Sequence, residues 1–149
     1  MAQEDKKLLL VDLSARLSYG VKVQHQHEYY LDEIQTIEHI SRQYGEIETE
    51  SVLGFVDDFK PYLRSMSSMT EEEKDEMFGI CTLSDCSVNS NWESVGVEIM
   101  SSNPRYGDHY STDYKVIDWL NAHHFDYRGL IEKGLAIEVT EENNPYKSI

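Results

Sequence analysis

The stretch Glu46-Ile47-Glu48-Thr49-Glu50-Ser51-Val52 carries the clearest strand signal in the chain. Its glutamates alternate with Ile47, Thr49 and Ser51, a two-residue period that is typical of a β-strand with one buried face. Leu53-Gly54-Phe55-Val56 follows directly and continues the apolar character. The alternation predicts a strand whose glutamates point to solvent and whose other face covers a core.

Further short strands are predicted on both sides of this stretch. Tyr19, Val21 and Val23 alternate with polar residues, and the β-branched and aromatic content between Glu28 and Ile40 favours strand over helix. Pro61 should end the β-rich region, because proline cannot donate to a ladder and is disfavoured in a central strand. Residues 18–64 are therefore expected to form a small SH3-like barrel or a curled antiparallel sheet.

Three helices are predicted to brace this β-rich half. Leucines 9, 10, 13 and 17 form a helical stripe over residues 4–17, and Gly20 is expected to end that segment. Thr70-Glu71-Glu72-Glu73 is a capping box that starts a helix over residues 71–81. A third helix is predicted over residues 113–125, with Asp113 as its cap. The predicted fold class is α+β.

The length of 149 residues suits one domain with one core. Residues 65–149 form the helix-containing half, and residues 82–112 are expected to be a variable loop region with one alternating stretch, Val95 to Ile99. The polar segment from Glu141 to Pro145 is expected to fray. No internal repeat or linker composition divides the chain.

The charge balance of 13 Lys+Arg against 28 Asp+Glu gives a net charge of -15. Such a chain is repelled by nucleic acids and anionic membranes at long range, so neither is an expected direct partner. The basic residues are scattered, and Lys6-Lys7 is the only adjacent pair. A protein partner with a basic surface remains open.

The compartment and the redox state follow from the termini and the cysteines. The N-terminus is too acidic, and its apolar run too short, for a signal peptide or a membrane span, so a cytoplasmic location is expected. Cys81 and Cys86 have no second ligand pair at zinc-binding spacing, and reduced thiols are expected in the cytosol.

The densest group of chemically capable residues spans positions 119 to 128. It comprises Trp119, His123, His124, Asp126, Tyr127 and Arg128. Neighbouring histidines on a helix point about 100° apart, so His123 and His124 are a poor chelating pair. The favoured interpretation is structural, with one histidine against the core, the other at the helix C-terminus, and Arg128 paired with an acid. A hydrolase or nuclease-like enzyme using either histidine with Asp126 is the alternative.

Other candidate sites are weaker. His25 and His27 share one strand face and would bind a metal only if Glu28 or Asp32 folded over them. Nucleotide-binding loops and nucleophile elbows are missing from the sequence. Neither a cofactor nor a metal is therefore predicted.

The acidic runs Glu46/Glu48/Glu50 and Glu71 to Glu76 support two interpretations. Spaced carboxylates can imitate the phosphates of DNA and occupy a basic groove on another protein. Glutamates on an exposed strand face and in a first helical turn also have local reasons to be there. The local explanation is favoured, and a DNA-mimic protein is kept as an alternative.

Three islands of sequence are similar to a known group of proteins. They are residues 13–23, residues 60–73 (KPYLRSMSSMTEEE) and residues 118–136 (DWLNAHHFDYRGLIEKGLA). The islands resemble uncharacterised short acidic proteins of gut-associated bacteria and their phages or prophages. The resemblance implies a mobile-element or accessory origin, and it carries no known activity.

The function predicted from the sequence is that of a non-enzymatic acidic interaction protein. A phage-encoded or mobile-element-encoded modulator or inhibitor of a host protein is the favoured version, and a small-ligand sensor in the β-rich half is a further alternative. The oligomeric state is left open. The predicted contact residues are Glu46, Glu48, Glu50, Trp119, His123, Asp126, Tyr127 and Arg128.

Overall fold

The computed structural model of the protein describes residues 1–30, 33–41, 43–80, 86–88, 99–101 and 114–147. The helices are α1 (Gln3–Arg16), α2 (Glu71–Ile80) and α3 (Tyr114–Ala122), with 3-10 turns η1 (Leu17–Tyr19), η2 (Val56–Asp58) and η3 (Met66–Ser68). The strands are β1 (Lys22–His25), β2 (Gln35–Ser41), β3 (Glu46–Thr49), β4 (Leu53–Phe55), β5 (Phe59–Ser65), β6 (Cys86–Val88), β7 (Ile99–Ser101), β8 (Phe125–Asp126) and β9 (Ile137–Glu138). The α+β prediction is confirmed.

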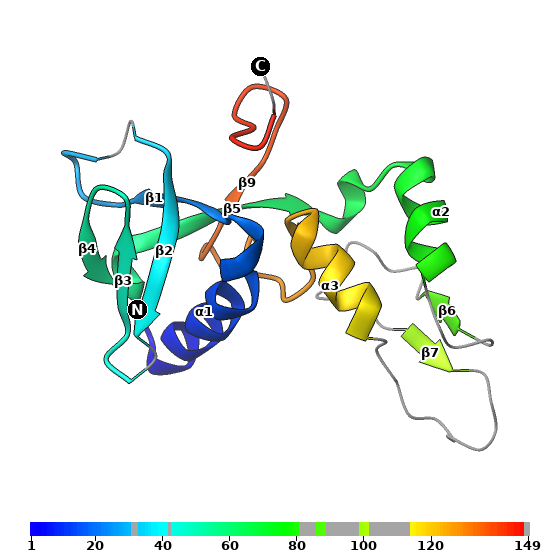
Figure 1. The fold of residues 1–149 in the computed structure, drawn as a ribbon, viewed down its shortest axis with the longest axis horizontal. Coiled ribbons are helices and arrows are strands. Elements are labelled where there is room, and N and C mark those ends of the chain that lie inside the picture. The colour runs from blue at the N-terminus through cyan, green and yellow to red at the C-terminus, as the bar shows by residue number, and fades with distance from the viewer. Residues whose placement is uncertain (31–32, 42, 81–85, 89–98, 102–113, 148–149) are drawn as a thin grey trace.

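The main sheet has the strand order β4-β3-β2-β1-β5-β8, and β9 also pairs with β5. The five N-terminal strands are antiparallel, and their sheet curls beside α1 (Figure 1). Strands β8 and β9 pair with β5 in parallel. A chain that alternates short strands with tight turns makes antiparallel neighbours, because parallel pairing requires a long crossover. Helices α2 and α3 both lie between β5 and β8 in the chain, so a crossover longer than a turn joins these two parallel strands.

Strand β3 confirms the alternation read from the sequence. Ile47 and Thr49 are buried, and Glu48 is exposed. The chain then reverses at Glu50 and Ser51, with the Thr49 N–H donating to the Val52 carbonyl at 2.9 Å. Ser51 is therefore exposed rather than on the buried face, because the strand ends two residues earlier than its sequence pattern.

Pro61 lies in a central strand, so the expectation that it would be excluded is wrong. It sits in β5 opposite Val23 of β1. The Gln26 N–H donates to the Asp58 carbonyl, which sets the hydrogen-bonded pairs of this antiparallel ladder at alternate positions. Pro61 falls between them, so its nitrogen faces away from β1. Pairing with β9 begins only at Tyr62, so no ladder bond is lost.

The buried apolar residues that are described form two clusters. The first lies between α1 and the sheet and includes Leu9, Leu13, Val23, Ile47 and Phe59. The second lies between α2, α3 and β8 and includes Met66, Met77, Trp119, Leu120 and Phe125. Figure 1 shows α3 between the sheet and α2, so the two clusters follow one another along the molecule.

The capping box at the start of α2 is confirmed. The Glu73 N–H donates to the Thr70 hydroxyl, and the Thr70 N–H donates to the Glu73 carboxylate, both at 3.1 Å. Arg64 of β5 also holds both Glu73 carboxylate oxygens at 2.7 Å. This pair lowers the pKa of Glu73 to about 2. The end of β5 is thereby tied to the first turn of α2.

The C-terminal segment is ordered by specific contacts, so the expectation of fraying is wrong for the residues described. The Asn143 side chain accepts from Thr140 and donates to the Glu138 carbonyl. The Tyr146 hydroxyl donates to the Tyr62 carbonyl at 2.7 Å and accepts from the Lys22 N–H at 3.0 Å. The segment therefore closes over β1 and β5. Cys81, Asp113 and the 95–98 part of the predicted edge strand lie outside the described residues, but Ile99 begins β7, which pairs with β6.

Gly54 in β4 tests the packing of the sheet. A Cβ at this position would lie 2.9 Å from the ring of Phe59, which is fully buried and cannot move aside. We expect Gly54→Ala to lower the free energy of unfolding by about 1–3 kcal/mol, measured by urea denaturation. Ser51→Ala, at the exposed hairpin turn, should change it little. Equal stabilities of the two variants would contradict this packing.

Candidate functional site

The residues from Trp119 to Arg128 lie where α3 ends and β8 begins. The His123 N–H and the His124 N–H donate to the carbonyls of Trp119 and Asn121 and close the last turn of α3. His124 has a φ of 63°, the left-handed conformation that commonly ends a helix. Glycine usually fills that position, so the side chain of His124 must have its own packing to be tolerated there.

His124 packs face to face against Tyr146, with ring centroids 3.5 Å apart and planes 9° apart. Burial lowers the pKa of His124 to about 4, with further lowering by the positive charge of Arg16, and of His123, Arg64 and Lys22. The imidazole is therefore neutral near pH 7. It serves as the packing partner of the C-terminal segment.

His123 lies on Trp119, with ring centroids 4.0 Å apart, and its Nδ1 is 2.9 Å from the Trp119 carbonyl oxygen. The side chain is thus bound to the last turn of its own helix, the helix C-terminal position that the sequence predicted for one of the two histidines. The Trp119 indole N–H donates to Glu76 of α2 at 3.2 Å. Trp119 therefore links α3 to α2, and His123 packs on its ring.

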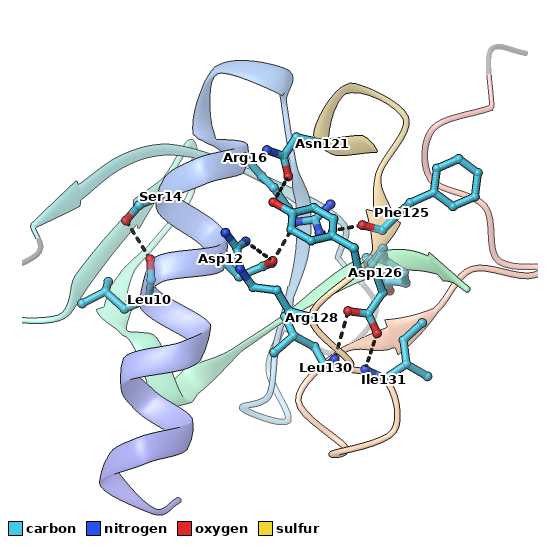
Figure 2. A network of polar contacts seen from close by, with 12 residues as sticks. Leu10, Asp12, Ser14, Arg16, Asn121, Phe125, Asp126, Arg128, Leu130 and Ile131 are labelled. Atoms are coloured by element: carbon cyan, nitrogen blue, oxygen red, sulfur yellow. Dashed lines mark hydrogen bonds and ion pairs between the residues drawn. The ribbon is translucent and has the colours of Figure 1, made fainter. Parts of the chain in front are cut away.

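Asp126 is held by the backbone of the following turn. Its two carboxylate oxygens accept from the N–H groups of Leu130 and Ile131, each at 2.9 Å (Figure 2). In the described part of the chain, the Asp126 carboxylate forms no hydrogen bond with the side chain of His123 or His124. The geometry thus does not assemble the acid and base pair that the hydrolase or nuclease-like alternative requires.

A buried charge network joins α1 to this region, as Figure 2 shows. Asp12 and Arg16 are both fully buried and are 2.8 Å apart on successive turns of α1. The second Asp12 oxygen accepts from Arg128 at 2.8 Å, and Arg16 also donates to the Phe125 carbonyl at 2.6 Å. Arg128 therefore pairs with an acid, as the sequence predicted. That acid lies 116 residues away in sequence.

Tyr127 lies close to both arginines of this network. The guanidinium carbons of Arg16 and Arg128 are 5.2 and 4.7 Å from the centre of its ring. Its hydroxyl donates to the Asn121 side chain at 2.8 Å. Of the predicted contact residues, Trp119, Asp126 and Tyr127 are buried, so they support the fold rather than offer a surface.

The glutamates of β3 do reach the surface. On the face of β3 opposite to the buried Ile47 and Thr49, Glu46 pairs with Phe55 and Glu48 pairs with Leu53 of β4. Leu53 and Phe55 are 63% and 54% exposed, although both are large apolar side chains. We call Glu46, Glu48, Leu53 and Phe55 the acidic edge face. Glu50 lies beyond it and accepts from the Thr36 N–H at 2.8 Å.

Directly opposed residues on one face of an antiparallel pair have Cβ atoms about 4.5–5.5 Å apart. The acidic edge face is therefore a row of two carboxylates beside a row of two apolar side chains. An exposed apolar pair next to charges is the kind of surface that marks a contact site in proteins. The sequence pattern found the glutamates and missed Leu53 and Phe55, because the hairpin at Glu50 and Ser51 changes which residues face outward.

The histidines near the β1–β2 turn pack among aromatic rings. His25 contacts Phe59 and Tyr30, with ring centroids 4.8 and 5.0 Å apart, and its Nδ1 accepts from the His27 N–H. Within the described ranges, no three side chains of His, Cys, Asp or Glu are placed to hold a metal ion. No helix in that part of the chain is both long and apolar enough to span a bilayer.

The buried network gives a stability prediction. Asp12→Asn leaves the fully buried Arg16 without its counter-charge, so we expect it to cost about 3–5 kcal/mol of unfolding free energy. Arg128→Gln removes the partner that is partly exposed and should cost less. Urea denaturation of the two variants measures the difference. The reverse order would show that Arg16 does not depend on Asp12.

The neutral His124 predicts an acid-dependent loss of stability. Its pKa is about 4 in the folded protein and 6.5 ordinarily, so the unfolded chain binds the proton more tightly. The free energy of unfolding should therefore fall as the pH drops from about 6.5 towards 4, by roughly 1–2 kcal/mol after screening at the partly exposed ring. Protonation of Glu73 lowers the free energy of unfolding further, but only below pH 4.5, the ordinary pKa of glutamate.

The control for this pH dependence is His124→Asn, because asparagine tolerates the left-handed conformation and does not titrate. Its unfolding free energy should change less than that of the wild type between about pH 7 and pH 5. If the unfolding free energies of the two proteins fall equally with pH, groups other than His124 cause the loss of stability.

The chain was compared with protein-family models, curated proteins and solved structures, and nothing matches it in any of the three.

Proposed function

We propose that the protein acts by binding another protein through the acidic edge face. The observation that supports this proposal is the exposure of Leu53 and Phe55 directly beside Glu48 and Glu46. A monomeric surface gains nothing from two large apolar side chains in water, whereas a contact with a partner would bury them. The neighbouring carboxylates select a partner with lysine or arginine at matching positions.

The net charge of -15 favours the same class of partner. It accelerates encounter with a basic surface and opposes nucleic acids and a second copy of the chain. Within the edge strand, the Phe55 N–H donates to the Asp58 carboxylate at 2.9 Å. This contact blocks one of the backbone groups that another strand would need, so side chains rather than strand pairing would carry the binding.

A modulator or inhibitor of a host protein, encoded by a phage or mobile element, is the version of this function that the sequence resemblance favours. A DNA mimic is less well supported, because apolar side chains occupy half of the acidic edge face. The enzyme alternative is also less well supported, because the Asp126 carboxylate accepts hydrogen bonds from the Leu130 and Ile131 backbone.

The test is an affinity capture from a lysate of cells that naturally contain the protein. The wild type should retain one stoichiometric basic protein that elutes with salt. Glu46→Lys/Glu48→Lys should lose it. The matched control Glu141→Lys/Glu142→Lys makes the same charge change at two exposed positions elsewhere and should keep it. Loss in both variants would mean that only net charge matters, and retention in both would remove this face from the function.

A further inference from the structure

A groove opens beside the acidic edge face, between the first turns of α1 and the turn that precedes β3. Its volume is about 800 Å³, and its lining includes Leu10, Tyr44, Phe55 and Val56. This volume is in the range of sites that hold a ligand of drug size or a few side chains. Phe55 lines the groove and also belongs to the acidic edge face, so the two surfaces are continuous.

Among the residues that line the groove, Tyr44 and Phe55 are aromatic, and Leu10 and Val56 are aliphatic. Tyr44 is 66% exposed and Phe55 is 54% exposed, while Val56 is buried. Aromatic and aliphatic lining groups bind an apolar side chain well, because such a side chain loses much of its contact with water there. Neither ring is needed to fill the core, since each keeps more than half of its surface in water.

The charges around the groove are balanced, in contrast to the molecule as a whole. Lys6 and Lys7 line the groove together with Glu4 and Asp57, and the Lys6 ammonium is 3.4 Å from the Asp57 carboxylate. An apolar group that covers an ion pair already formed leaves no charge without a counter-charge, which keeps the cost of desolvation low. The groove therefore suits an uncharged side chain, and the surface beyond Phe55 suits basic ones.

We infer that the groove is the anchor site of the proposed basic partner, and that it takes one large apolar side chain, aromatic or aliphatic, from a peptide segment of that partner. The inference rests on the proposed function and adds the feature that the segment must contain. With the anchor in the groove, the residues next to it in the segment cross Phe55 and reach Glu46 and Glu48. A second copy of the chain does not fit, because its net charge of -15 would repel the first.

The test uses two synthetic peptides of equal length and equal positive charge, one with a central tryptophan and one with a central serine. Their binding to the full ¹⁵N-labelled chain is followed by NMR. The tryptophan peptide should bind about tenfold tighter and should shift the amide signals of Leu10, Gly45 and Val56. Tyr44→Ser should remove most of this preference. The control Tyr29→Ser, at a tyrosine that is 79% exposed near the β1–β2 turn, should not.

The outcomes separate the groove from the proposed function. Equal affinities for the two peptides, with unshifted groove signals, would overturn the anchor site and leave the acidic edge face in place. Absence of binding by either peptide would also overturn it, while the affinity capture judges the proposed function independently. If Tyr44→Ser has the same melting temperature as the wild type, the variant is folded. Loss of its preference for the tryptophan peptide then supports the anchor site.

Discussion

The buried Asp12–Arg16 pair is the contact on which the rest of the structure depends. It places a full positive and a full negative charge out of water on one helix, which is favourable only if both are further satisfied. Arg128 donates to Asp12, and the Phe125 carbonyl accepts from Arg16, and both of these groups come from the chain after α3. The N-terminal helix can therefore be buried only when the C-terminal half is in place, and the two apolar clusters are joined by polar contacts.

This dependence explains why the residues from Trp119 to Arg128 look like a reactive site in the sequence. Histidine, aspartate, tyrosine and arginine are used here to end a helix, cap a turn and neutralise α1. The polar cluster therefore supports the fold, and the proposed recognition surface is a different one, formed by the carboxylates beside Leu53 and Phe55. Clusters of titratable residues mark functional sites only in a statistical sense, and local hydrogen bonds account for this one.

Local signals in the sequence predicted local structure well. The capping box at Thr70 and the alternation through Glu48 depend on neighbouring residues alone, and both are confirmed. The predictions failed where distant segments decide. Pro61 is tolerated because of the register of β1 against β5, and Tyr146 is ordered by His124, Tyr62 and Lys22. In the sequence, Asp12 and Arg16 flank the leucine stripe of the first helix, and only the fold shows that both are fully buried.

The most direct test that the polar cluster supports the fold is the unfolding free energy of Asp126→Asn. If the carboxylate exists to cap Leu130 and Ile131, the variant loses charge-assisted hydrogen bonds and should be less stable by about 1–3 kcal/mol. A residue kept for chemistry or binding is commonly neutral or unfavourable for stability. Wild-type or higher stability of Asp126→Asn would therefore contradict the account and return the cluster to the list of functional sites.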